Sequence, residues 1–166
     1  MKIIGVVGWK NTGKTGLVTR LVSHFVASGL RVSTIKHAHH SFDVDHEGRD
    51  SYRHREAGAA QVLISSRERV ALMEELRGSP EPSLDELLGR LAPADLVIIE
   101  GYKGEGHSKV EAHRGETGTE ILARGDSSII AVASDVPLSN LSIPVIDLDE
   151  TAQIADLISD HLGLTL

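Results

Sequence analysis

A phosphate-binding pattern stands close to the start of the chain. The residues from Gly8 to Thr15 read GWKNTGKT, which satisfies G-x-x-x-x-G-K-S/T. Backbone N–H groups of such a loop surround an anion, and the dipole of the helix that follows adds positive potential. In this pattern Lys14 contacts the β- and γ-phosphates of a nucleoside triphosphate, and the Thr15 hydroxyl binds Mg²⁺. The loop residues that we expect to contact the cofactor are Gly8, Asn11, Thr12, Gly13, Lys14, Thr15 and Gly16.

A magnesium site at this loop needs a second acid, and Glu100 is the candidate. It follows the apolar run 96–99, which has the composition of a buried parallel strand. Because the carboxyl ends of parallel strands face the ligand crevice, we assign Glu100 as a catalytic residue and, together with Thr15, as a metal ligand. The structural alternatives are that Glu100 pairs with Lys103 or caps a turn. Lys103 is also a candidate cofactor contact and opens a cationic series with Lys109 and Arg114, of which Arg114 fits a solvated position best.

Residues 35–59, IKHAHHSFDVDHEGRDSYRHREAGA, hold five of the nine histidines. Three interpretations stay open: a metal site of the zinc type, a loop that binds a phosphorylated molecule, or a polar loop without a ligand. Asp50 is a candidate catalytic residue that would orient water or contact Mg²⁺. The candidate cofactor contacts in this segment are Lys36, His37, His39, His40 and Arg49.

Recognition of a base is carried by one candidate, Asp135, directly after the β-like run 129–134. A carboxylate at such a position can accept hydrogen bonds from the ring N–H and the 2-amino group of guanine. A turn-forming Asp before Pro137 is the structural alternative.

Alternating strand and helix patterns predict the fold. Helical spacing of apolar residues runs from Leu17 to Val26 and ends at Gly29, and a second such pattern ends at Gly163. Ser83 and Glu86 form a capping box. We therefore predict an α/β, P-loop NTPase-like fold with a mostly parallel sheet flanked by helices, in a single nucleotide-binding domain over residues 1–166. The predicted strands are Ile3–Val7, Arg31–Ile35, Gln61–Ile64, Leu96–Ile99, Ile129–Ala133 and Val145–Leu148.

Two segments interrupt this alternation and look like hairpin insertions. Residues 69–75 follow the strand at 61–64 closely enough to pair with it, and residues 109–113 precede a glycine-containing stretch. Both are candidate edge strands for a dimer face.

Composition narrows the classes of partner. Seventeen Lys and Arg against 24 Asp and Glu give a net charge of −7, which argues against a protein that coats nucleic acid or an anionic membrane. The absence of cysteine excludes disulfides and thiolate metal sites. The start of the chain has neither the apolar core nor the cleavage site of a secretory signal, and no run is long enough to span a bilayer. We expect a cytoplasmic protein.

These blocks together resemble the molybdopterin-guanine dinucleotide biosynthesis protein B family over nearly the whole chain. The resemblance is carried by residues 8–15, by the histidine-rich segment 35–59, by LVIIEGYK at 96–103 and by IIAVASDVP at 129–137. Departures from the family pattern are Ala38, where Asp or Thr is usual, and Arg49, where Lys is frequent.

The resemblance implies a P-loop fold that binds GTP with Mg²⁺, hydrolyses GTP weakly at best and forms a homodimer. It also implies work with molybdopterin guanylyltransferase, the enzyme that joins GMP to molybdopterin. Residues 36–40 and Asp50 would then face the nucleotide or the pterin, molybdopterin or its dinucleotide. Two other functions stay open from the residues alone: a small-molecule kinase, and a nucleotide-dependent metallochaperone that holds its metal on His37, His39 and His40.

Overall fold

The computed structural model describes residues 1–38 and 42–165. The chain divides into two compact units, one formed by Met1–His37 with Leu91–Leu166 and the other by Ala38–Arg90. The prediction of a single nucleotide-binding domain stays a prediction. Among the described residues, no helix combines the length and the apolar character needed to cross a bilayer.

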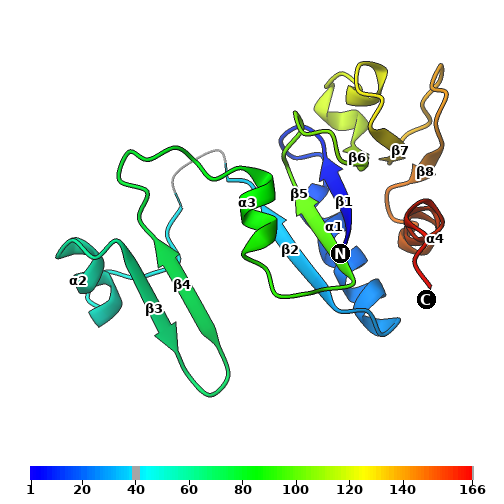
Figure 1. The fold of residues 1–166 in the computed structure, drawn as a ribbon. Coiled ribbons are helices and arrows are strands. Elements are labelled where there is room, and N and C mark those ends of the chain that lie inside the picture. The colour runs from blue at the N-terminus through cyan, green and yellow to red at the C-terminus, as the bar shows by residue number, and fades with distance from the viewer. Residues whose placement is uncertain (39–41, 166) are drawn as a thin grey trace. The chain divides into compact units, whose positions relative to one another are not determined.

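The first unit is built on a six-stranded sheet in the order β2-β5-β1-β6-β7-β8, in which every pairing is parallel (Figure 1). This confirms the mostly parallel sheet that the Val- and Ile-rich runs predicted. The strands are β1 (Lys2–Val7), β2 (Val32–Lys36), β5 (Leu96–Glu100), β6 (Lys109–His113), β7 (Ile129–Ser134) and β8 (Val145–Asp147).

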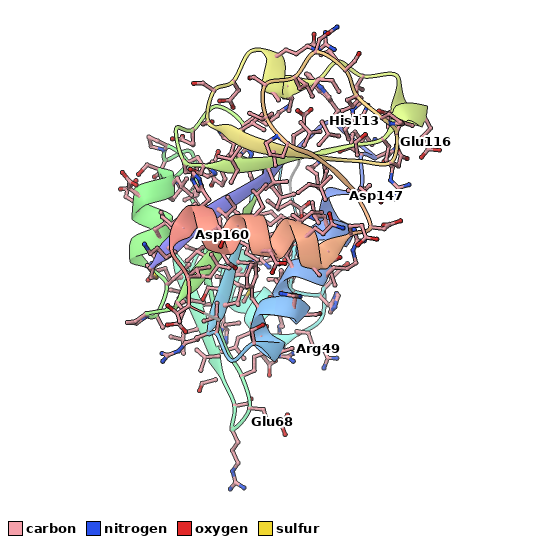
Figure 2. The ribbon with its side chains drawn as sticks, turned by 90° about the vertical axis from the view of Figure 1, so that its right-hand side faces the viewer. Arg49, Glu68, His113, Glu116, Asp147 and Asp160 are labelled. Carbon is pink, nitrogen blue, oxygen red and sulfur yellow. The ribbon has the colours of Figure 1, made fainter. Side chains whose placement is uncertain are left out.

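Two helices, α1 (Lys14–Ala27) and α4 (Thr151–Leu162), pack on one face of this sheet. Leu21 and Phe25 of α1 and Ile158 of α4 are fully buried in one apolar cluster with Ile4 and Val6 of β1. In Figure 2, α4 lies in front of the sheet, and the labelled Asp160 is on its exposed side. Because α1 is anchored along its length, its first turn is held at the end of β1.

The opposite face of β6 is polar and nevertheless buried. Lys109 lies 3.0 Å from the carboxylate of Asp126 and also donates to Ser128, and it is only 1% exposed. Glu111 is fully buried and accepts hydrogen bonds from the backbone N–H groups of Leu122 and Ala123, at 2.8 and 2.9 Å. These contacts hold the segment 114–128, which contains two 3₁₀ turns, η1 (Gly115–Thr117) and η2 (Leu122–Arg124).

This buried polar face corrects two predictions. Residues 109–113 are not an edge hairpin, because β6 lies inside the sheet between β1 and β7. Lys109 does not belong to an exposed cationic series, because its ammonium is buried against Asp126. The alternation of polar and apolar residues imitates a half-exposed strand, although the polar side chains find their partners inside the protein.

The second unit contains α2 (Asp50–Glu56), an antiparallel hairpin of β3 (Gln61–Ser65) and β4 (Val70–Glu74), and α3 (Leu84–Gly89). The hairpin confirms the pairing predicted for residues 61–64 and 69–75. The capping box before α3 is also confirmed, since Ser83 and Glu86 bond each other's backbone N–H groups.

We expect Glu111→Ala to lower the free energy of unfolding by roughly 2–4 kcal/mol, because the N–H groups of Leu122 and Ala123 lose their acceptor in a partly buried place. Glu111→Gln keeps one acceptor oxygen at nearly constant volume and should cost less. Urea titration of the three proteins measures the difference. Equal stability of the wild type and the Ala variant would contradict the role given to Glu111.

Candidate functional site

The loop between β1 and α1 has the backbone of a phosphate-binding turn. Gly8, Asn11 and Gly13 have φ values of 146°, 65° and 92°, all in the range that side chains seldom adopt. A Cβ on Gly8 would stand 2.4 Å from the carbonyl oxygen of Ala112 in β6, so only glycine fits there. The loop is therefore drawn tightly against β6 before α1 begins at Lys14.

Side chains of the loop fold back on its own backbone. The Thr12 hydroxyl and the Lys14 ammonium both donate to the carbonyl of Trp9. Burial lowers the pKa of Lys14 from its ordinary value, and the nearby Glu100 carboxylate only partly opposes this. A phosphate group beside Lys14 would favour the charged form of the lysine, because a nearby negative charge stabilises the ammonium.

Three side chains converge where β5 ends. The Thr15 hydroxyl donates to Glu100 at 2.9 Å, and the Lys36 ammonium lies 3.1 Å from the same carboxylate oxygen. Hydroxyl and carboxylate oxygens are ligands that Mg²⁺ prefers. Glu100 is thus paired with Lys36 at the end of β2, rather than with Lys103 as the structural alternative held.

The ends of β2 and β5 are joined tightly at this point. The His37 N–H donates to the Glu100 carbonyl at 2.9 Å, and the His37 ring lies 4.7 Å from that of Tyr102. Gly101 has a φ of 102°, and a Cβ there would lie 3.1 Å from the Cβ of His37. His37 is therefore placed beside the acid of the site by the backbone of both strands.

An open cavity of about 510 Å³ lies over the loop. Many of the candidate residues from the sequence line it: its lining residues are Lys10, Asn11, Gly13, Lys14, Thr15, Gly16, Glu100, Arg114 and Glu116. Arg114, which fitted a solvated position best from the sequence, lies in this wall instead. Its Nε is 3.2 Å from where a Cβ on Gly13 would stand. The signal that would have found it is its position directly after β6, the strand next to β1.

Asp135 lies at the end of β7 and is already engaged. Its carboxylate accepts the Gly115 N–H at 2.8 Å and lies 3.7 Å from the Arg114 guanidinium. These contacts hold the loop that follows β6, whose neighbours His113 and Glu116 are labelled in Figure 2. Recognition of guanine by Asp135 would have to replace them, and it stays a prediction.

Lys103 and Trp9 form a pair on another side of the loop. The Lys103 ammonium lies 4.0 Å from the centre of the Trp9 ring, in a cation–π contact. The Trp9 indole N–H donates to the carbonyl of Glu120 at 3.0 Å. The indole therefore ties the phosphate loop both to the residues after β5 and to the segment 114–128.

The remaining candidates belong to the second unit or lie outside the described residues. Arg49 and Asp50 stand at the start of α2, where the Asp50 carboxylate is exposed and 4.0 Å from Arg53. They line an open cavity of about 540 Å³ within that unit, and their roles stay predictions. His39 and His40 lie outside the described residues. Among the residues described, no group of three or more His, Asp or Glu side chains is arranged to hold a metal ion.

We expect Gly8→Ala to destabilise the protein by about 1–3 kcal/mol from backbone strain alone, with a further cost from the contact with Ala112. Gly16→Ala is the matched control, because its Cβ would meet only the flexible end of Arg20, at 3.5 Å. Thermal unfolding of both variants measures the difference. A Gly8→Ala protein as stable as the Gly16→Ala protein would mean that the loop is not held against β6.

Known proteins are similar to this chain in sequence and in fold. The family model described as molybdopterin guanine dinucleotide synthesis protein B matches residues 3–135. A molybdopterin-guanine dinucleotide biosynthesis adapter protein from Haemophilus influenzae is 40% identical over 163 residues, covering 96% of this chain and 89% of its own. The adapter protein of the same description from Escherichia coli is 39% identical over 165 residues, covering 96% of this chain and 93% of its own.

Solved structures agree. The crystal structure of a MobB protein homologue from Bacillus stearothermophilus superposes with a TM-score of 0.76 at 28% identity, over 99% of this chain and 100% of that one. A crystal structure of molybdopterin-guanine biosynthesis protein B gives a TM-score of 0.73 at 27% identity, over 96% and 99% of the two chains. With its phosphate loop, its parallel sheet and these matches over most of its length, the chain belongs to the molybdopterin guanine dinucleotide synthesis protein B family.

Proposed function

We propose that this protein is a GTP- and Mg²⁺-binding adapter that assists a molybdopterin guanylyltransferase in attaching GMP to molybdopterin. Membership of the family places it in molybdopterin-guanine dinucleotide biosynthesis. The observation that carries the nucleotide part is the convergence of Lys14, Thr15 and Glu100 at the wall of an open cavity of about 510 Å³ over the loop.

The donor set fits a magnesium triphosphate. The amides of residues 10–15 and the start of α1 supply N–H donors, and Lys14 and Arg114 supply positive charge to the cavity. Thr15 and Glu100 would hold Mg²⁺, which supplies charge neutralisation between neighbouring phosphates. Lys36, now paired with Glu100, would then be released toward the terminal phosphate.

The adapter part of the proposal rests on the acids at the cavity and on the contacts that they make. In the first unit, as far as it is described, the acids at the cavity are Glu100, held by Thr15 and Lys36, and the exposed Glu116. Asp50, the proposed water-orienting residue, is fully exposed at the start of a short helix. We propose that hydrolysis is weak and that bound nucleotide chiefly orders the histidine-rich segment for contact with molybdopterin or its dinucleotide.

We also propose that the protein acts as a homodimer formed through the β3–β4 hairpin. Leu63 and Leu72 are directly paired across the hairpin, and with Val70 they share one of its faces. These three side chains are 62%, 55% and 63% exposed. An apolar face of this kind on a two-stranded hairpin needs a cover, and a second copy of the hairpin supplies a matching one.

We expect GTP with Mg²⁺ to change the fluorescence of Trp9, the sole tryptophan of the chain. Its backbone carbonyl accepts a hydrogen bond from the Lys14 ammonium, so an anion that draws Lys14 away should alter the surroundings of the indole. Lys14→Ala should abolish the change, since the charge that contacts the β- and γ-phosphates is gone. Lys2→Ala, at the far end of β1, is the charge-matched control. A wild-type protein that is silent at millimolar GTP would count against nucleotide binding.

We expect Leu72→Glu to convert the dimer into a monomer, because it places a charge in the middle of the proposed apolar contact. Val26→Glu is the control, since Val26 is 53% exposed on α1 in the other unit. Light scattering after size exclusion reads the mass directly. A wild-type monomer, or a Leu72→Glu dimer, would rule out this interface.

A further inference from the structure

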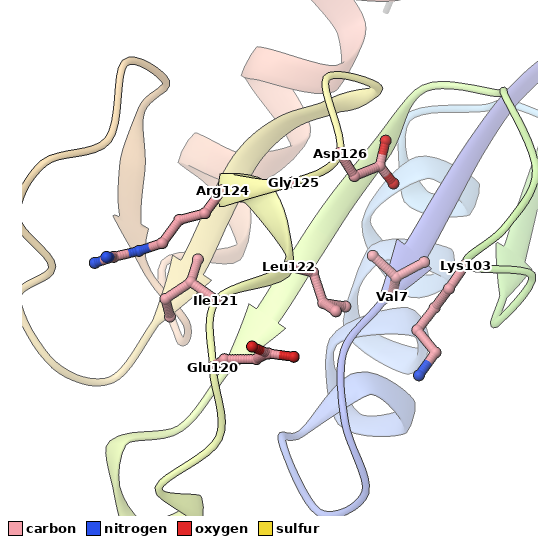
Figure 3. A pocket seen from close by; sticks show the side chains of 8 residues that line it. All are labelled: Val7, Lys103, Glu120, Ile121, Leu122, Arg124, Gly125 and Asp126. Carbon is pink, nitrogen blue, oxygen red and sulfur yellow. The ribbon is translucent and has the colours of Figure 1, made fainter.

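A second cavity, of about 500 Å³, lies beside the phosphate loop, and we call it the side cavity. It is distinct from the cavity over the loop, since the two share no lining residue. Its apolar part is formed by Val7, the last residue of β1, and by Ile121 and Leu122. Figure 3 shows Glu120 and Lys103 on opposite sides of it, with Val7 and Leu122 between them.

The wall of the side cavity is held from behind, so the cavity does not depend on its occupant. Glu111 receives the N–H groups of Leu122 and Ala123, and Lys109 holds Asp126. Partial burial acts to raise the pKa of Asp126, but hydrogen bonds from Ser128 and Lys109 together outweigh it and hold that pKa below its ordinary value. A preformed wall of this kind spares a ligand the cost of ordering it.

Among the described charged groups that line the side cavity, Glu120 is the one that is both without a partner and directed into it. Among the described residues, the Glu120 carboxylate makes neither a hydrogen bond nor an ion pair, and Figure 3 shows it directed across the cavity toward Lys103. The Arg124 guanidinium, by contrast, points away from the cavity. A carboxylate at the rim of an apolar surface can accept two N–H groups from one edge of a flat ligand whose face packs on that surface.

Lys103 supplies a hydrogen-bond donor to the side cavity. Its ammonium, which lies over the Trp9 ring, can donate to an acceptor atom on the opposite side of such a ligand. The ligand that fits carries an amino group beside a ring N–H on the edge that faces Glu120, and an acceptor atom on the side that faces Lys103. Trp9 joins the two sides, because its ring contacts Lys103 and its N–H bonds the carbonyl of Glu120.

We propose that the side cavity binds a 2-amino-4-oxopyrimidine ring, with Glu120 accepting its N–H groups and Val7 and Leu122 packing against its face. Guanine and pterins share this ring. The proposal deepens the proposed function and rests on it for the choice between these sources, which are the base of the bound nucleotide and a separate pterin.

Isothermal titration with guanosine and with 6-hydroxymethylpterin as probes tests the proposal. Glu120→Ala should weaken binding of at least one probe by about 10–100-fold, the worth of hydrogen bonds to a charged group. Asp160→Ala, which removes an exposed carboxylate on α4 away from the cavity, is the charge-matched control and should leave the affinity unchanged. If neither probe binds, or if Glu120→Ala binds both as tightly as the wild type, the proposal is overturned.

Two further measurements distinguish the base of the bound nucleotide from a separate pterin as the ligand. They also test the side cavity independently of nucleotide binding at the loop. If GTP with Mg²⁺ blocks the pterin probe and Glu120→Ala weakens GTP, the base of the nucleotide occupies the side cavity. If the pterin probe binds equally well with GTP present, the ligand is a separate pterin. The Lys14→Ala protein should still bind the probes, so a loss of GTP binding alone would count against the proposed function and not against the side cavity.

Discussion

The site depends on one constraint, the parallel pairing of β1 with β5 on one side and with β6 on the other. Val6 is level with Glu100 in the first pairing and Val7 with Glu111 in the second, so β1 and β5 end within one residue of each other while β6 continues to His113. The loop that leaves β1 therefore opens beside the acid that ends β5. Its first glycine is pressed against the backbone of β6, and a side chain there would separate the two.

Cations outnumber acids at the cavity over the loop, although acids outnumber cations in the chain as a whole. The chain carries a net charge of −7, yet three cations line the cavity over the loop, against two acids: Lys10, Lys14 and Arg114, with Glu100 and Glu116. An acidic surface discourages binding to long polyanions, whereas a local group of cations at a helix start holds a small one. This separation of charge suits a protein that selects a small phosphorylated molecule.

The polar face of β6 links the phosphate loop to the rest of the first unit. Burying Lys109 and Glu111 is costly unless each is fully paired, and each is, through Asp126 and through two backbone amides. The result is an irregular segment, 114–128, that is tied to β6 by these side chains. It brings Arg114 to one side of the loop and the carbonyl of Glu120 to the Trp9 indole on another.

From its sequence alone this protein could be read as an α/β phosphate-binding fold, since glycine spacing, strand composition and helix caps are local signals that act through nearby residues. Gly8, Lys14 and Thr15 could be placed in one loop because it is one short segment, and Glu100 at the end of a strand because the end of an apolar run marks a strand end, whereas their roles stay predictions. The order of the strands in the sheet depends on contacts between distant segments of the chain, so local patterns did not predict it. Only the tertiary structure decided that β6 is an inner strand, that Lys109 and Glu111 are buried, and that Arg114 faces the phosphate cavity. The physical reason is that a polar residue in a strand has the same local pattern whether its partner is water or a buried group brought from elsewhere in the chain.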